Sequence, residues 1–220
     1  MSLLFPILSK FWPSLMVFSN KNTVMINKTN ITRDDILDMS DYEQIRDKRR
    51  AEIAKIKKNR RLAVGPHASF YFECYQTMWY QIHEMLRIEK GGECQIQDEI
   101  EVYNSLIPKG TELVATVMFE IPDAQARAKI LADLGGVEQT IKMEIGKETI
   151  YAKPEDDVDR TSSAGKTSSV HFIHFLMNPI QVNAFKRSDT RVVIGIDHPN
   201  YGHLAVLPDY IKRNLSDDLE

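Results

Sequence analysis

The hydrophobic pattern of the chain changes its period near Lys109–Gly110, and this change constrains the fold more than any other feature. Before it, apolar residues recur every three or four positions, as in amphipathic helices. After it, apolar and polar residues alternate, as in strands with two different faces. Helices followed by strands are typical of an α+β domain. We therefore predict a single α+β domain with a mostly antiparallel sheet of about five to seven strands, flanking helices and a helical hairpin.

The helical part begins with a basic helix and continues with the hairpin. Ser40 followed by Glu43 forms a capping box, which predicts a helix over about residues 41–60. The stretch "YQTMWYQIHEMLRIEKGGE" carries one apolar stripe, and Gly91–Gly92 is expected to end that helix. A second helix should then run to Pro108. So short a connection predicts two antiparallel helices.

The strand pattern is most regular in "VEQTIKMEIGKETIYAK". Its alternation predicts Ile141 and Met143 inside and Glu138 and Glu144 outside, with a hairpin turn at Gly146–Lys147. Further strands are predicted in "TELVATVMFEI", "SSVHFIHFLM" and "TRVVIGIDHPNYGHLAVL". These segments supply the predicted antiparallel sheet.

The first 29 residues differ from the rest of the chain in composition. They are strongly apolar, but Lys10 interrupts the run, Pro6 and Pro13 would break a helix, and no basic segment precedes it. We predict that residues 1–29 are a disordered or mis-annotated N-terminal extension, with Met25 as an alternative start and a weak membrane anchor as the rival hypothesis. Residues 30–220 then form the domain, with no expected membrane span and a cytoplasmic location.

Several common chemistries are excluded by their missing residues. Cys74 and Cys94 are the two cysteines, too few for an iron–sulfur cluster of the chain's own, and free thiols fit a reducing compartment. The stretch "AGKTSS" resembles half of a P-loop, but Arg160 stands where the first glycine is required. An acidic segment precedes it and a predicted strand follows. We therefore expect no P-loop nucleotide, and this segment is interpreted as a polar connection.

Histidines provide the candidate metal ligands. His171 and His174 point to opposite faces of one predicted strand, so that strand alone cannot direct both at one ion. A looser site for zinc, iron or manganese would combine a helical His-Glu pair with the sheet histidines. The candidate ligands are His83, Glu84, His171, His174 and His198. The alternative is that each histidine is a structural residue with its own backbone partner.

The basic helix is the candidate partner-binding element. Its cations outnumber its acids, and such a run can bind an acidic protein or follow a phosphate backbone. The candidate residues are Arg46, Lys48, Arg49, Arg50, Lys57, Lys58, Arg60 and Arg61, with Lys55 in the same run. No glycine-flanked aromatic motif accompanies them, and the net charge is −3, so nucleic acid is the less favoured partner. A solvated arm with no partner is the third interpretation.

Several stretches resemble an uncharacterised bacterial family, domain of unknown function DUF3501. They span Ile31 to about Pro208 and include "ITRDDILDM", "NSLIPKGTELVATVMFEI", "PEDDVDRTSSAGKTSSVHFIHF" and "HPNYGHLAVLP". The resemblance carries no catalytic residues. It implies that the protein is encoded beside rubrerythrin-like proteins and iron–sulfur oxidoreductases. This gene neighbourhood in turn implies an accessory role in oxidative stress.

These observations leave three functional hypotheses. The first is an accessory protein, metal-binding in one version, that works with an iron–sulfur or di-iron redox system. The second is an enzyme whose small-molecule pocket is lined by Trp79, Tyr80, His83 and the sheet histidines. The third is an RNA-associated protein that uses the basic helix. Catalytic residues are not identified by the sequence.

Overall fold

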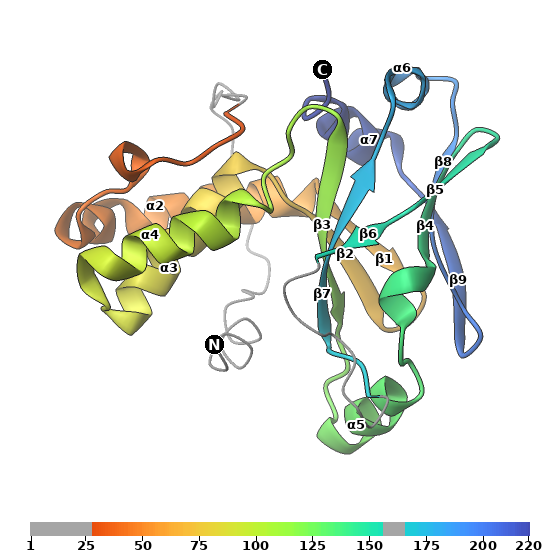
Figure 1. Cartoon of the computed structure of the whole chain (residues 1–220), viewed down its shortest axis with the longest axis horizontal. Coiled ribbons are helices and arrows are strands. Elements are labelled where there is room, and N and C mark those ends of the chain that lie inside the picture. The colour runs from red at the N-terminus through yellow and green to blue at the C-terminus, as the bar shows by residue number, and fades with distance from the viewer. Residues whose placement is uncertain (1–27, 156–165) are drawn as a thin grey trace.

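The computed structural model describes residues 28–155 and 166–220, and it contains a two-sheet body with a helical arm at one side (Figure 1). The predicted N-terminal extension, apart from residues 28 and 29, and most of the polar connection around Gly165 lie outside the described residues. Within them, no helix has the length and apolar character needed to cross a membrane.

The first sheet contains five antiparallel strands in the order β1-β2-β3-β7-β6. Their bounds are Arg61–Val64, Ala68–Phe72, Glu112–Phe119, Val170–Leu176 and Lys153–Pro154. The central strand β3 is buried along its whole length, as its apolar residues on both faces predicted. It pairs with β7 over seven residues, from Glu112 opposite Leu176 to Met118 opposite Val170.

The second sheet contains four antiparallel strands in the order β5-β4-β8-β9. Their bounds are Glu148–Tyr151, Ile141–Ile145, Val192–His198 and Tyr201–Val206. The inner faces of the two sheets share one hydrophobic core, to which Val117, Ile173, Met143 and Ile194 contribute fully buried side chains. The remaining helices of this body are α5 (Ala124–Ala132), η2 (Val137–Thr140), α6 (Pro179–Lys186) and α7 (Asp209–Ser216).

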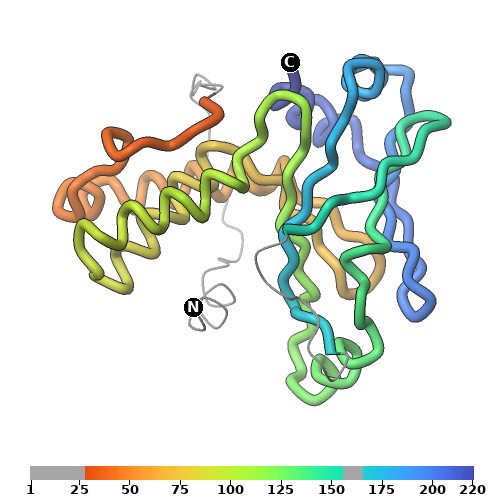
Figure 2. The backbone as a smooth tube through the Cα atoms, viewed as in Figure 1, coloured from red at the N-terminus to blue at the C-terminus, as the bar shows by residue number. Residues whose placement is uncertain are grey.

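The helical arm consists of α2 (Met39–Lys58), α3 (Tyr75–Glu89) and α4 (Gly92–Asn104), with the short η1 (Arg33–Asp35) beside it. Helix α3 packs against both α2 and α4. A second hydrophobic core lies here, and Val114 from β3 joins Ile82 and Tyr103 in it. Figure 2 shows that the chain crosses between arm and body after α2, after β2 and after α4. We call this junction the elbow.

The predicted α+β class is confirmed, and the structure refines it. The strands form two sheets of five and four rather than a single sheet of five to seven. The N-cap of α2 is Asp38 and not Ser40, and Lys90 rather than a glycine adopts the left-handed conformation that ends α3. Glu138, predicted to face solvent, is buried because it lies in η2 before the strand begins.

Candidate functional site

The structure places His83 in the interior of the arm. Its Nε2 accepts a hydrogen bond from the backbone N–H of Leu37 (3.1 Å), and its Nδ1 lies 2.8 Å from the carbonyl oxygen of Trp79. The ring packs against Tyr42 and Trp79, with centroids 4.7 and 3.9 Å away. Burial lowers the pKa of His83 to about 4. A neutral imidazole with both nitrogens occupied is a structural residue of this core.

Glu84 is also committed to packing within the arm. Arg46 donates Nε–H to its Oε1 (2.8 Å) and Nη2–H to its Oε2 (2.9 Å), and the Tyr42 hydroxyl donates to Oε1 (2.8 Å). Burial raises the pKa of this carboxyl, but the hydrogen bonds from Arg46 and Tyr42 outweigh burial and leave it lowered. The carboxylate therefore ties α2 to α3.

The histidines of β7 lie on opposite faces of the strand, as the alternation predicted. His171 is buried on the inner face, edge-on to Phe119, with Nε2 2.9 Å from the carbonyl oxygen of Ser168. His174 lies on the outer face, between Glu112 and Glu155. Neither ring approaches the surroundings of His83.

His198, the last predicted ligand, lies at the end of β8. Its Nε2 is 3.3 Å from the carbonyl oxygen of Gly135, and its Nδ1 accepts from the backbone N–H of Asn200 (3.2 Å). The five predicted ligands thus do not converge: His83 and Glu84 both contact Tyr42 in the arm, whereas the other three histidines have separate partners in the body. Within residues 28–155 and 166–220, no group of three or more His, Cys, Asp or Glu side chains is arranged to hold an ion.

The predicted partner-binding cations divide into structural and outward-facing residues. Arg60 is 1% exposed and forms an ion pair with Asp218 at the elbow. Arg61 belongs to β1 and pairs with Glu120 (2.8 Å), while Arg46 is bound to Glu84. Arg49 pairs with Glu52 and lies 5.3 Å from the centre of the Trp79 ring. These four arginines therefore have partners within the chain.

The other cations share the outward half of α2, which we call the basic face. On a helical wheel the five positions fall within one half-circle, together with two acids, Asp47 and the Glu43 that pairs with Arg87. All are exposed except the half-buried Lys57. The basic face consists of Lys48, Arg50, Lys55, Lys57 and Lys58.

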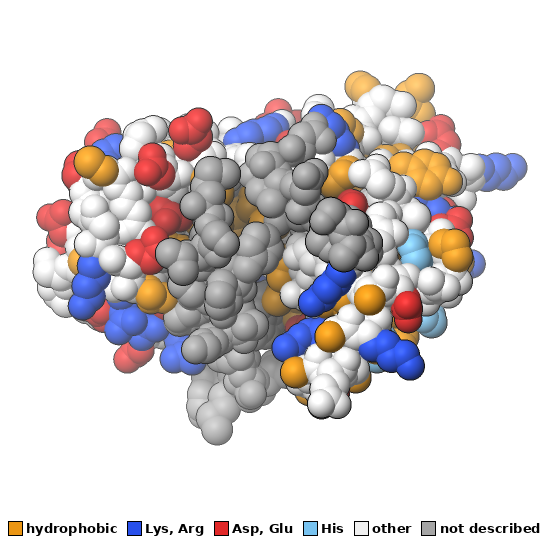
Figure 3. Space-filling model, turned by 60° about the horizontal axis from the view of Figure 1, so that its bottom comes forward, with side chains coloured by type: hydrophobic (Ala, Val, Ile, Leu, Met, Phe, Trp, Pro, Cys, Tyr) orange, Lys and Arg blue, Asp and Glu red, His pale blue; other side chains and the backbone are white. Residues whose placement is uncertain are grey.

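Helix α4 has the opposite composition, because it contains acidic residues and no Lys or Arg, whereas the acids of α2 lie among its cations. Glu93, Asp98 and Glu101 are exposed there, and α3 separates α4 from α2. Figure 3 shows this segregation, with Asp and Glu along one edge of the arm and Lys and Arg along the other. The arm is thus an electrically polarised element.

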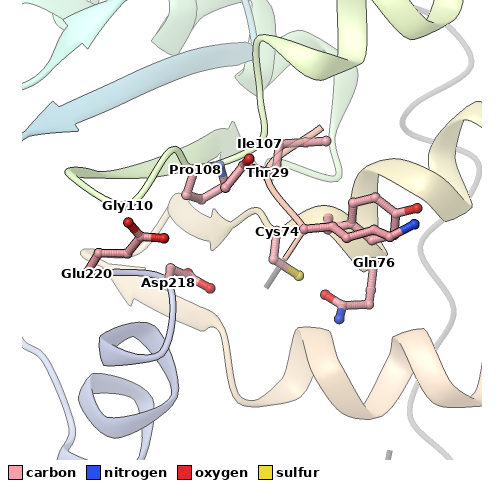
Figure 4. A pocket seen from close by; sticks show the side chains of 10 residues that line it. Thr29, Cys74, Gln76, Ile107, Pro108, Gly110, Asp218 and Glu220 are labelled. Carbon is pink, nitrogen blue, oxygen red and sulfur yellow. The ribbon is translucent and has the colours of Figure 1, made fainter. Parts of the chain in front are cut away.

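A small cavity lies at the elbow (Figure 4). Cys74 at the start of α3 lines it, and Asp218 and Glu220 reach it from the C-terminal segment. Its volume of about 30 Å³ is that of a single water in the liquid. Ligand sites typically measure about 300–1,000 Å³. None of the residues predicted to line an enzyme pocket, His83, Trp79 or Tyr80, borders this cavity.

A larger hollow of about 350 Å³ lies on the outer face of the second sheet. Its lining combines open apolar side chains, Leu204 and Val206 among them, with one acid and one base, Glu144 and Arg191. This lining contains neither a histidine nor a cysteine. The hollow therefore lacks the side chains on which the predicted enzyme hypothesis depended.

The sequence interpretation missed the contacts that pair residues far apart in the chain. Asp218 neutralises Arg60 across 158 positions, and Glu84 neutralises Arg46 across 38. It also missed the role of Cys74, whose sulfur caps α3 by accepting from the Thr77 backbone N–H while Thr77 Oγ1 accepts from Cys74 N–H (2.9 Å). The C-x-x-T spacing before an apolar helical stretch was the available signal for this cap.

Comparisons with known proteins agree with this architecture. A crystal structure of a novel protein of unknown function from Burkholderia pseudomallei is 34% identical, with a TM-score of 0.80, over 87% of this chain and 100% of that chain. A search of curated proteins gave no match. The model of a family described as protein of unknown function (DUF3501) matches residues 30–219. Because that match covers most of the chain, the protein belongs to the DUF3501 family.

Proposed function

We propose that this protein is an accessory protein that binds an acidic partner protein through the basic face of α2. The observation that carries the proposal is the composition of that face, with five cations and two acids on the outward half of one helix, one of which (Glu43) is paired with Arg87. The residues predicted to be ligands or pocket walls have internal partners instead. The geometry therefore supports recognition at the surface of the arm better than chemistry inside it.

The basic face has the dimensions of a protein-docking element. From Lys48 to Lys58 the helix rises by about 15 Å, and the five cations form a broad strip that covers the outward half of the helix over this length. Ala51 and Ala54 lie between the cations on the exposed side, and their small side chains do not project beyond those of the cations. A row of carboxylates on a partner could approach this strip closely, and such complementarity mainly raises the association rate and sets specificity.

The arm presents the basic face on a fixed support. Arg46 and Tyr42 bind α2 to Glu84 of α3, and Arg87 of α3 pairs with Glu43 of α2 (2.6 Å). Ordered groups lose less conformational entropy when they bind, so a held helix favours association. The contacts between Arg46 and Glu84 therefore hold α2 in place, and this order lowers the entropic cost of binding through the remaining cations.

The charge distribution favours an acidic protein over nucleic acid. A phosphate backbone would meet the basic face but also the acidic α4 of the same arm, in a chain whose net charge is −3. The outward half of α2 also lacks aromatic side chains on which bases could stack. A compact carboxylate patch can match the strip without reaching α4.

The class of partner is proposed from the family resemblance. That resemblance implies an iron–sulfur oxidoreductase or a rubrerythrin-like protein, and hence an accessory role in an oxidative-stress system. The exposed cations of the basic face support an association of this kind. A metal held by this chain is not part of the proposal, because its histidines have separate partners.

The test is a binding titration with purified partners of these two types from the same organism. The variant Lys48→Glu/Lys55→Glu/Lys58→Glu reverses three charges of the basic face. We expect its dissociation constant to rise by about tenfold or more, which corresponds to about 1.4 kcal/mol, with weaker binding of the wild type as salt increases. Carbodiimide coupling should join lysines of α2 to carboxylates of the partner.

The control reverses three exposed lysines elsewhere, in Lys129→Glu/Lys147→Glu/Lys186→Glu. It changes the net charge by the same amount and should leave the affinity unchanged. Equal losses in both triple variants would indicate a general charge effect and contradict a localised site. Tight RNA binding that is lost only in the α2 variant would replace the protein partner with nucleic acid. Binding to neither class would leave the basic face a solvated surface and refute the proposal.

A further inference from the structure

His174 forms a bridge between two carboxylates on the outer face of the five-stranded sheet. Its Nδ1 lies 2.8 Å from Glu112 Oε2 and its Nε2 lies 2.9 Å from Glu155 Oε1. A neutral imidazole carries one N–H and can donate to only one of these oxygens, whereas an imidazolium donates to both. Two carboxylates at hydrogen-bond distance on opposite sides of the ring therefore match the protonated form.

The electrostatic surroundings support that protonation state. Burial lowers the pKa of His174, but the hydrogen bonds and negative charges of Glu112 and Glu155 outweigh burial and raise it above 6.5. Other charged groups also face this region. Lys153 stands directly opposite on β6. Glu73 follows β2 and donates its backbone N–H to the carbonyl oxygen of Val114, the residue opposite His174 on β3. Lys109 is close enough to be influenced by Glu112.

The bridge ties down a weakly held edge strand. Strand β6 contains only Lys153 and Pro154, paired with His174 and Ile173 of β7. Proline has no N–H to donate to a ladder, and the next backbone bond runs from Glu155 N–H to the carbonyl oxygen of Phe172 (3.1 Å). With so few backbone bonds, the side-chain contact between Glu155 and His174 is a major part of the attachment.

We propose that His174 is a proton-dependent clasp that holds β6 and Glu155 against the edge of the five-stranded sheet. At acidic pH the imidazolium donates to both carboxylates and the strand is fastened. When the ring loses its proton, one of the two bonds is lost and two carboxylates remain without the positive charge between them. The strand then detaches more often, and the edge of β7 becomes accessible. This inference is independent of docking through α2.

The direction of the pH dependence follows from linkage. The pKa of His174 is higher in the folded protein than its ordinary value of 6.5. The native state therefore binds a proton that the unfolded or detached state does not. The stabilisation is fully present below about pH 6.5 and is lost as the pH rises through the folded value. Each unit by which the pKa is raised corresponds to about a tenfold change in the detachment equilibrium.

Two measurements on the full chain test the clasp. An NMR titration of the histidine ring protons should show His174 titrating above 6.5. Hydrogen exchange at pH 6 and pH 8.5, corrected for intrinsic rates, should show the amides of Lys153 and Glu155 losing protection at the higher pH by about tenfold per unit of pKa elevation. In His174→Gln, which cannot carry a charge, protection of this segment should be low and the same at both pH values.

The matched control is His198→Gln, because His198 contacts backbone groups and no carboxylate. It should retain the pH dependence of the wild type. A His174 resonance that titrates at or below 6.5, or equal protection of the Lys153 and Glu155 amides at both pH values in the wild type, would overturn the clasp. Both of these results come from the wild-type protein, so they stand even if His174→Gln does not fold.

Discussion

Arg60 provides the sharpest test of how the arm is fixed to the body, because its neighbour Arg61 is a built-in control. Arg60 donates Nε–H to the carbonyl oxygen of Phe72 (2.9 Å) and Nη2–H to that of Glu73 (2.8 Å). Its remaining N–H groups bind Asn214 and Asp218. The guanidinium thus joins the end of β2 to the C-terminal segment, and it is 1% exposed.

Replacing Arg60 with methionine keeps much of its volume but removes every one of these bonds. Two buried carbonyl oxygens and the buried carboxylate of Asp218 then lose their partner. Breaking a buried ion pair by removing one member costs about 3–5 kcal/mol, against a total stability of about 5–15 kcal/mol for a typical domain. With a urea m-value of about 2 kcal/mol per molar, the midpoint should fall by about 1.5–2.5 M.

The control is Arg61→Met. The Arg61 side chain is 46% exposed, and its pairing with Glu120 is that of a surface ion pair. Such pairs contribute about 0–1 kcal/mol, so the urea midpoint should move by less than about 0.5 M. Urea unfolding followed by circular dichroism compares the two variants directly. Equal midpoints for Arg60→Met and Arg61→Met would show that burial and the Asp218 contact do not stabilise the elbow.

Three further predictions address the arm and the contact between the sheets. Burial lowers the pKa of His83 to about 4, so between pH 6.5 and 4 the unfolded chain binds a proton that the native chain does not. The free energy of unfolding should therefore fall by about 3 kcal/mol as the pH falls through this window, and His83→Gln should abolish that dependence in denaturant titrations. Glu84→Gln leaves the Arg46 charge without its carboxylate, so the amides of α2 should exchange at least about tenfold faster while those of β3 keep their protection; unchanged α2 protection would contradict the proposed tie. Tyr201→Phe removes a hydroxyl that donates to the Val64 carbonyl oxygen (2.8 Å) and accepts from the His67 and Ala68 N–H groups (2.9 Å each). The substitution should lower the free energy of unfolding in urea by about 2 kcal/mol, and a loss below about 0.5 kcal/mol would mean that water replaces the hydroxyl.

The local elements could be predicted because they depend on hydrophobic period and cap chemistry within a few residues. The alternation in 141–151 predicted the β4–β5 hairpin, with its turn at Gly146–Lys147. The opposite orientations of His171 and His174 also followed from alternation alone. Such features need no knowledge of distant parts of the chain.

The pairing of distant segments could not be predicted in the same way. The strands of the described residues divide into two sheets, and the chain passes from β5 of one sheet to β6 of the other at Ala152, where no local pattern marks the crossing. Strand β1 was missed because its four residues, "RLAV", are too few to establish an alternation, and Arg61 reads as the end of the basic run that precedes it. The eight predicted cations looked alike in sequence, yet Arg60 is buried in an ion pair with Asp218 and Arg46 forms an ion pair with Glu84.

The packing also explains why recognition is proposed on the arm. The inner faces of both sheets meet in one core, where Phe70, Leu113, Phe175 and Phe185 are fully buried, and interiors packed at normal protein density leave no room for a metabolite. The elbow cavity has the volume of one water. Helix α2, by contrast, uses only Tyr42 and Ile53 as buried anchors, so most of its surface faces outward. That surface repeats cations at helical spacing, and a partner with carboxylates at the same spacing would account for it.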